Sequence, residues 1–126
     1  MERLSVNEIR KSHETEEERA EILQKMLDKL PPIVAADLGD CYEVLDGNHR
    51  AEAARLLDEE GEDYTLNAII VPNEVYAYAE EKGIEQMSLA AAAYKKEGFE
   101  EEAEKALEVN GIKDEMEEAL KYWGQI

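Results

Sequence analysis

The spacing of apolar residues changes at Pro72, and this change constrains the fold more than any other feature. Before Pro72, stretches with strand character alternate with stretches that have helical spacing. The predicted strands are 4–9, 33–36, 41–45 and 64–71, and the predicted helices are 15–29 and 48–57. After Pro72 every pattern is helical, over residues 74–82, 86–97, 99–109 and 112–123. We therefore predict an α/β (α+β) fold, with a small mixed sheet in residues 1–72 and a C-terminal helical extension in residues 73–126 packed on it.

The acidity of the chain limits its partners. The 126 residues carry a formal net charge of −18, and residues 84–126 hold 11 acidic and 5 basic side chains. Such a surface repels phosphate backbones and anionic lipid headgroups. We therefore expect no direct DNA binding and no membrane binding, although a local basic spot can still capture a small anion.

Cysteine usage and hydropathy predict a cytoplasmic protein. Cys41 is the only cysteine in the sequence, so no internal disulfide can form, which fits a reducing compartment. The N-terminal residues contain no apolar signal core. No apolar run approaches the roughly 20 residues that a membrane-spanning helix needs.

The segment Asp46-Gly47-Asn48-His49-Arg50 joins a predicted strand to a predicted helix. The first N–H groups of a helix have no partner within the helix, and the helix dipole there favours negative charge, so such a turn can bind phosphate. We expect the residues from Gly47 to Arg50 to bind phosphate, with Arg50 as a forked cation. His49 is a candidate proton shuttle because its pKa lies near neutrality. Asp46 is a candidate magnesium ligand or a partner that orients His49.

Two basic residues in the first turn of a helix oppose its dipole and cost stability. A bound anion would remove this conflict, and the conflict is the main physical indication of function in the chain. A structural interpretation stands beside it. Asp-Gly is also a common hairpin turn, Asp46 can simply cap the helix, and Arg50 can pair with one of many surface glutamates.

Residues 31–57, PPIVAADLGDCYEVLDGNHRAEAARLL, and the following strand YTLNAIIVP resemble the ParB/sulfiredoxin superfamily. Members share an apolar strand after a proline, a hairpin, a D-G-x-H-R or G-E-R-R type motif that opens a helix, and a closing strand. The resemblance covers residues 4–72 and is most specific at Asp46, Gly47, His49, Arg50 and Ala54. It implies a ParB/sulfiredoxin-like sheet topology. The D-G-x-H-R form is closest to the free-serine-kinase-like and uncharacterised branch.

The resemblance also implies chemistry, because members bind nucleotide phosphates at this helix start. For this chain it implies Mg²⁺ with ATP, ADP or CTP as cofactors, phosphate binding by Gly47, His49 and Arg50, and a metal or positioning role for Asp46. The serine kinases use an acidic residue near the first helix as a base. The matching segment here is SHETEEE, so the resemblance makes Glu14 and Glu16 candidate catalytic residues, with Ser12 and His13 beside them.

Departures from the family pattern argue against two of its activities, the reduction of oxidised peroxiredoxin and chromosome partitioning. Sulfiredoxin has a catalytic cysteine inside the motif, where this chain has Asn48. Cys41 lies on the strand before the motif, where a buried apolar role is expected. The chain also lacks the G-E-R-R-like box, the second nucleotide box and the basic helix-turn-helix domain of partition proteins, and its own C-terminal helices are acidic.

Three functions remain as hypotheses. The first is a nucleotide-dependent phosphotransferase that acts on a small hydroxylated acceptor such as serine. The second is a non-catalytic module that senses a nucleotide and meets a protein partner through the helical extension. The third is a DNA partition or nuclease role, which the charge argues against.

Overall fold

The computed structural model describes residues 2–5, 9–11, 31–48, 50–51 and 65–126. Within these residues, five strands form one sheet and four helices follow it. The strands are β1 (Glu2–Ser5), β2 (Ile9–Lys11), β3 (Ile33–Asp37), β4 (Tyr42–Asp46) and β5 (Thr65–Val71). The helices are α3 (Asn73–Lys82), α4 (Gln86–Lys96), α5 (Glu100–Asn110) and α6 (Lys113–Trp123).

The sheet is mixed, in the order β1-β5-β3-β4-β2. Strands β3 and β4 pair antiparallel, as do β1 and β5, whereas β3 with β5 and β2 with β4 pair parallel. This confirms the predicted fold class, a small mixed sheet with α+β organisation. It also confirms the predicted hairpin, because a short turn through Gly39 joins β3 directly to its antiparallel neighbour β4.

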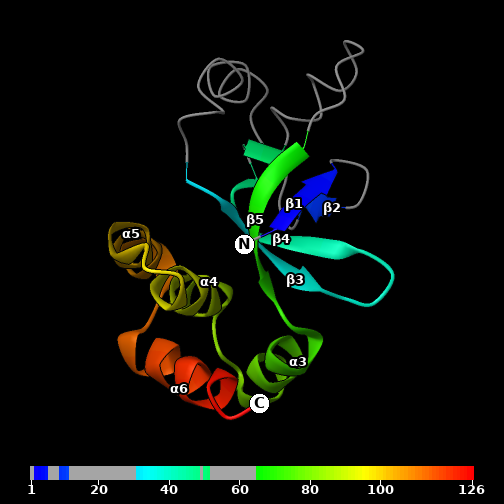
Figure 1. The fold of residues 1–126 in the computed structure, drawn as a ribbon. Coiled ribbons are helices and arrows are strands. Elements are labelled where there is room, and N and C mark those ends of the chain that lie inside the picture. Colours follow the sequence, from blue (N-terminus) through cyan, green and yellow to red (C-terminus); the bar gives the residue numbers. More distant parts are fainter. Residues whose placement is uncertain (1, 6–8, 12–30, 49, 52–64) are drawn as a thin grey trace.

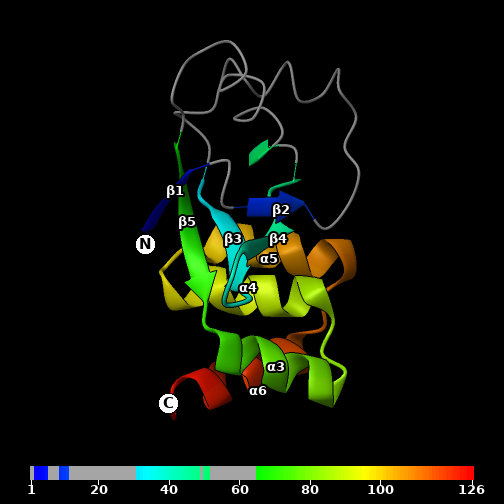
Figure 2. The same ribbon diagram turned by 90° about the vertical axis from the view of Figure 1, so that its right-hand side faces the viewer.

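The prediction of one strand over residues 4–9 is wrong. Its two ends belong to different strands, β1 and β2, which form the two opposite edges of the sheet (Figures 1 and 2). Three other strands lie between them. The alternation of apolar and polar residues signals extended backbone in both pieces, but it carries no information about which strand each piece pairs with.

The four predicted helices after Pro72 are confirmed, each within about one residue of its expected ends. They gather on one side of the sheet, and α4 lies between the strands and helices α5 and α6, whereas α3 contacts β3 directly (Figures 1 and 2). The whole middle of α4 is buried because it contacts β3, β4 and β5 as well as α5 and α6. Residues Ala90 to Ala93 are fully buried, as the small size of alanine allows where helices and a sheet approach closely.

One hydrophobic core joins the sheet to the helical extension. Alternate strand residues point into it, because successive side chains of a strand face opposite sides of the sheet. From the sheet it contains Val34, Ala36, Leu45, Ile69 and Val71. From the last helix it contains Trp123, which packs the C-terminal end of α6 into the core. Strand residues of the other face, Ile33 among them, are also buried.

A buried polar network fixes the start of α4 against α6. The hydroxyl of Ser88, which is fully buried, donates to Glu115 Oε1 at 3.0 Å and accepts from the backbone N–H of Ile112 at 2.8 Å. The same Glu115 oxygen accepts from the backbone N–H of Glu85 at 3.0 Å. The Glu115 carboxylate of α6 thus supplies the negative charge that the start of α4 favours, because the N-cap side chain of α4 makes no capping bond.

The residues of the predicted helix 15–29 lie outside the described part of the chain.

Candidate phosphate site at the turn after strand β4

Strand β4 ends at Asp46, and the chain turns at once into helical backbone. Gly47 has a φ of 104°, which side-chain-bearing residues rarely adopt. Asn48, Arg50 and Ala51 are helical, and the N–H of Ala51 donates to the carbonyl of Gly47 at 2.9 Å. The predicted strand–turn–helix arrangement around the DGNHR segment is therefore present in the described residues.

The turn is packed too closely to tolerate a side chain at Gly47. A Cβ atom placed there would lie 2.5 Å from Ile33 Cγ2 and 2.9 Å from Ile33 Cβ. It would also lie 3.1 Å from Arg50 Nη2. Gly47 is therefore required twice, once for its backbone conformation and once for its lack of a Cβ, and the turn has little freedom to move.

Arg50 faces inward from this turn. Its Nη1 donates to the carbonyls of Pro31 at 2.6 Å and Pro32 at 3.0 Å. Its Nη2 donates to the hydroxyl of Tyr94 at 3.1 Å and lies 3.6 Å from Asp46 Oδ2. Only 13% of the Arg50 side chain is exposed. Both terminal nitrogens of the guanidinium thus hold parts of the protein together.

Tyr94 of α4 joins the same group from the helical extension. Its single hydroxyl hydrogen has two acceptors within reach, Asp46 Oδ2 at 2.9 Å and the Pro32 carbonyl at 3.0 Å. Burial raises the pKa of Tyr94 well above its ordinary value; the charge of Arg50 acts to lower it, and that of Asp46 raises it further. The hydroxyl therefore stays protonated and remains a donor throughout the neutral range. We call Asp46, Arg50 and Tyr94 the clasp.

The clasp balances the charge of Arg50, one of the two basic residues behind the electrostatic conflict that the sequence suggests. The positive charge of Arg50 is balanced by Asp46 and by two backbone carbonyls, so no bound anion is needed to explain a cation in the first helical turn. The structural interpretation, in which Arg50 pairs with a carboxylate, is correct in kind. Its partner, however, is the aspartate four residues earlier and not a surface glutamate.

The expected metal role of Asp46 stays a prediction. One of its oxygens accepts from Tyr94 and lies beside Arg50, and the side chain is 31% exposed. Among the described residues, no three His, Cys, Asp or Glu side chains form a group suited to a metal ion. Any cation at Asp46 would therefore rely on ligands from the bound nucleotide and water, as magnesium at phosphate sites does.

Several predicted site residues lie outside the described part of the chain. These are the candidate catalytic residues Glu14, Glu16 and His49, together with Ser12 and His13. Their roles stay predictions. The described site residues Asp46, Gly47, Asn48 and Arg50 do come together in one turn, because they are neighbours in the sequence.

Sequence reasoning missed Tyr94. It lies at the end of the run AAAAYKK, where the helical pattern marks it as a core residue and nothing marks its hydroxyl as a partner of Asp46. Its burial is complete, and among the described residues no buried side-chain nitrogen or oxygen atom lacks a hydrogen-bond partner. A large buried tyrosine needs a partner for its hydroxyl, and this requirement is the one sequence-level signal that points to a polar contact at Tyr94.

Among the solved structures that resemble this chain is sulfiredoxin from Arabidopsis thaliana. The match covers 60% of this chain and 91% of that protein, at 20% identity and a TM-score of 0.46. Another is the C-terminally truncated chromosome-partitioning protein ParB from Caulobacter crescentus, complexed to the centromeric parS site. That match covers 95% of this chain and 70% of that protein, at 18% identity and a TM-score of 0.46.

No protein-family model and no curated protein matches the sequence. In the described ranges, no helix is long and apolar enough to cross a membrane. The structural neighbours named here are a sulfiredoxin and a ParB protein.

Proposed function

We propose that this chain binds the phosphate groups of a nucleotide at the turn after β4. The ligand groups are the main-chain N–H groups from Gly47 to Arg50 and the side chains of Asn48 and His49. The observation that carries the proposal is the geometry of Gly47, whose positive φ and tight packing against Ile33 hold a strand-to-helix turn in one conformation. A rigid turn of this kind presents helix-start N–H groups with little loss of entropy when an anion binds.

Arg50 has a different role in this proposal from the one expected from its sequence position. Its terminal nitrogens hold the Pro31 and Pro32 carbonyls and Tyr94, and its side chain is largely buried. We therefore assign Arg50 to positioning the turn. In this proposal the main-chain N–H groups of the turn and the side chains of Asn48 and His49 contact the phosphate directly.

Phosphoryl transfer is the more specific form of the proposal. It adds Mg²⁺ at Asp46, a nucleotide such as ATP, ADP or CTP, and a small hydroxylated acceptor such as serine, with Glu14, Glu16 or His49 as the base. The resemblance of the DGNHR segment supports this form. It is tested by turnover of ATP or ADP with serine, read by ³¹P NMR. Formation of phosphoserine supports the transferase, whereas binding without turnover leaves the nucleotide-binding module.

Binding is tested by calorimetric titration of ATP, ADP and CTP with Mg²⁺ into the wild type and two matched variants. Asn48→Asp adds a negative charge at the start of the helix after Gly47. Asn73→Asp makes the same change at the first residue of α3, where it also removes the donor that Asn73 Nδ2 supplies to the Asp37 carbonyl at 2.9 Å. Both changes agree with the helix dipole, so neither destabilises its helix through charge. A carboxylate at position 48 repels phosphate within contact distance, whereas one at position 73 does not.

We expect the wild type and Asn73→Asp to bind one of the nucleotides equally, and Asn48→Asp to bind it at least about tenfold more weakly, the equivalent of about 1.4 kcal/mol. Absence of heat from every nucleotide with the wild type refutes the proposal. If the two variants bind the nucleotide equally, the phosphate site does not lie at this turn.

A second candidate is a non-catalytic protein-interaction module. The observation that favours it is the clasp itself, because Asp46 and Arg50 neutralise each other and are linked to α4 without any ligand. The absence of nucleotide binding in the titration above, with an intact fold, supports this candidate. A DNA role is the third hypothesis. The acidity of residues 84–126 argues against it, and fluorescence anisotropy with duplex DNA at low salt tests it.

A further inference from the structure

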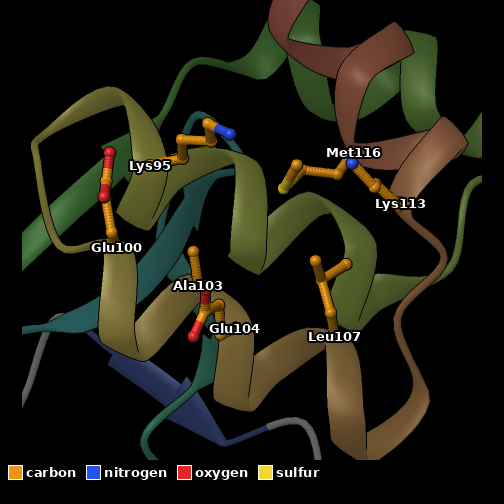
Figure 3. Close-up of a pocket in the computed structure, with 7 residues that line it drawn as sticks. All are labelled: Lys95, Glu100, Ala103, Glu104, Leu107, Lys113 and Met116. Atoms are coloured by element: carbon orange, nitrogen blue, oxygen red, sulfur yellow. The ribbon is translucent and has the colours of Figure 1, made fainter.

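A second site lies away from the clasp, between α4, α5 and α6. It is a pocket with a volume of about 280 Å³ (Figure 3). Its floor is apolar and consists of Ala103, Leu107 and Met116, and the first and last of these are almost completely buried. The volume lies just below the roughly 300–1,000 Å³ of pockets for drug-sized ligands, so it suits a smaller molecule.

The charged side chains around the pocket are divided by sign. Glu100 and Glu104 come from α5, one helical turn apart. Lys95 comes from the last turn of α4 and Lys113 from the first turn of α6, so α5 supplies both negative groups and the neighbouring helices supply both positive ones (Figure 3). Among the described residues, no ion pair within 4 Å joins these four side chains. The pocket is therefore locally neutral and dipolar on a chain with a net charge of −18.

Lys113 stands at a position that the helix does not favour. A positive charge in the first turn opposes the helix dipole, whereas Lys95, in a last turn, agrees with it. Asp114 and Glu115 already supply negative charge in the same first turn, so Lys113 matters here as one of the two positive groups of the pocket. A negative group bound between the two lysines would pair with both. The opposite wall, with Glu100 and Glu104, suits a positive group at the other end of the same molecule.

We propose that this pocket binds a short apolar peptide with free termini, of about dipeptide size. Its carboxylate lies toward Lys95 and Lys113, its ammonium lies toward Glu100 and Glu104, and its apolar side chains cover the floor. A ligand with one sign of charge meets repulsion from one wall, and an uncharged ligand leaves both walls without a partner. This inference does not depend on the nucleotide site, because the two sites share no residue.

The test is an NMR titration of the full ¹⁵N-labelled chain with three peptides. The first is Ala-Leu, the second is N-acetyl-Ala-Leu, which lacks the ammonium, and the third is Ala-Leu amide, which lacks the carboxylate. We expect saturable shifts confined to amides of residues 95–116 with Ala-Leu, at a dissociation constant of roughly millimolar. Because Lys95, Lys113, Glu100 and Glu104 are exposed, each blocked peptide should bind about twofold to fivefold more weakly, the range for an exposed ion pair.

Ala-Leu amide separates the proposal from simple attraction to an acidic surface. This peptide is a cation, so long-range attraction alone would make it bind more tightly than the neutral zwitterion. The proposal requires the reverse order. Tighter binding of Ala-Leu amide, shifts that spread over the whole acidic surface, or no saturable shift with Ala-Leu at about 20 mM overturns the proposal.

Paired variants assign each wall to one end of the ligand. Lys95→Gln with Lys113→Gln should abolish the discrimination between Ala-Leu and its amide. Glu100→Gln with Glu104→Gln should abolish the discrimination between Ala-Leu and N-acetyl-Ala-Leu. Unchanged discrimination in either pair also overturns the proposal.

The control exchanges a charge pair on α5 that does not line the pocket. Glu101 and Lys105 form an exposed ion pair with a distance of 3.5 Å. Glu101→Gln with Lys105→Gln alters the same helix and leaves the net charge unchanged, whereas each pocket pair changes it by two charges. It should leave all three affinities unchanged. A loss of affinity in this control as large as in the pocket variants contradicts the assignment to the pocket.

Discussion

Replacing Tyr94 by phenylalanine removes the hydroxyl that links α4 to the turn after β4 and leaves the ring in place. The hydroxyl accepts from Arg50 Nη2 at 3.1 Å, and its hydrogen serves Asp46 Oδ2 at 2.9 Å or the Pro32 carbonyl at 3.0 Å. Hydrogen bonds to charged groups contribute about 1.5–3 kcal/mol each. The full loss of both charged contacts would therefore cost several kcal/mol.

Two features of the clasp reduce this cost. Arg50 keeps its bonds to two proline carbonyls, and the Asp46 side chain is 31% exposed, so water can replace the lost donor. We therefore expect Tyr94→Phe to lose the equivalent of one charged hydrogen bond, about 2 kcal/mol of unfolding free energy. For a chain of this size that corresponds to a fall in Tm of about 6–10 °C.

Tyr78→Phe is the matched control. The Tyr78 hydroxyl donates to Glu118 Oε1 at 3.0 Å, but that hydrogen bond is exposed. The same atom is removed in both variants, and the two sites differ in burial and in the number of partners of the hydroxyl. Differential scanning calorimetry of the two variants and the wild type gives the comparison. A Tm of Tyr94→Phe within about 2 °C of that of Tyr78→Phe refutes the structural importance assigned to the clasp.

Three further perturbations test other parts of the fold. Burial raises the pKa of Tyr94 and, with hydrogen bonds to two glutamates, that of Tyr76. Deprotonation is then easier in the unfolded chain, so the stabilisation is complete below the ordinary tyrosine pKa of 10.0 and is lost as the pH rises above it. The unfolding free energy should fall by up to about 1 kcal/mol per pH unit for Tyr94 and by less for half-exposed Tyr76. Urea unfolding should show this slope, and the slope should be smaller when both tyrosines are replaced by phenylalanine. Gly47→Ala should lower the unfolding free energy by at least about 3 kcal/mol, through backbone strain and the clash with β3. Gly39→Ala has a similar φ of 97° and open space around it, so it should cost only the strain of about 1–2 kcal/mol. Equal losses of unfolding free energy in the two variants contradict the clash. Ser88→Ala leaves the backbone N–H before α6 without its partner and should cost about 2 kcal/mol in chemical denaturation, and a loss below about 0.5 kcal/mol would show that water replaces the hydroxyl.

The sequence by itself determined the elements that depend on near neighbours. The hairpin of β3 and β4, the four helices after Pro72 and the turn at Gly47 all follow from apolar periodicity and turn residues within a few positions of each other. These signals are local because a helix or a tight turn closes its hydrogen bonds over four residues or fewer. The same locality explains why the candidate site residues from Asp46 to Arg50 were found together.

The tertiary structure alone decided which distant segments meet. It placed β1 and β2 on opposite edges of the sheet, although only three residues separate them in the chain. It also brought Tyr94 to Arg50 and Asp46, which lie 44 and 48 residues earlier, and so made Arg50 a buried link between strand, turn and helix. Strand pairing and the partners of a buried hydroxyl or guanidinium depend on how whole elements pack, and no single-sequence pattern encodes the distance between residues so far apart.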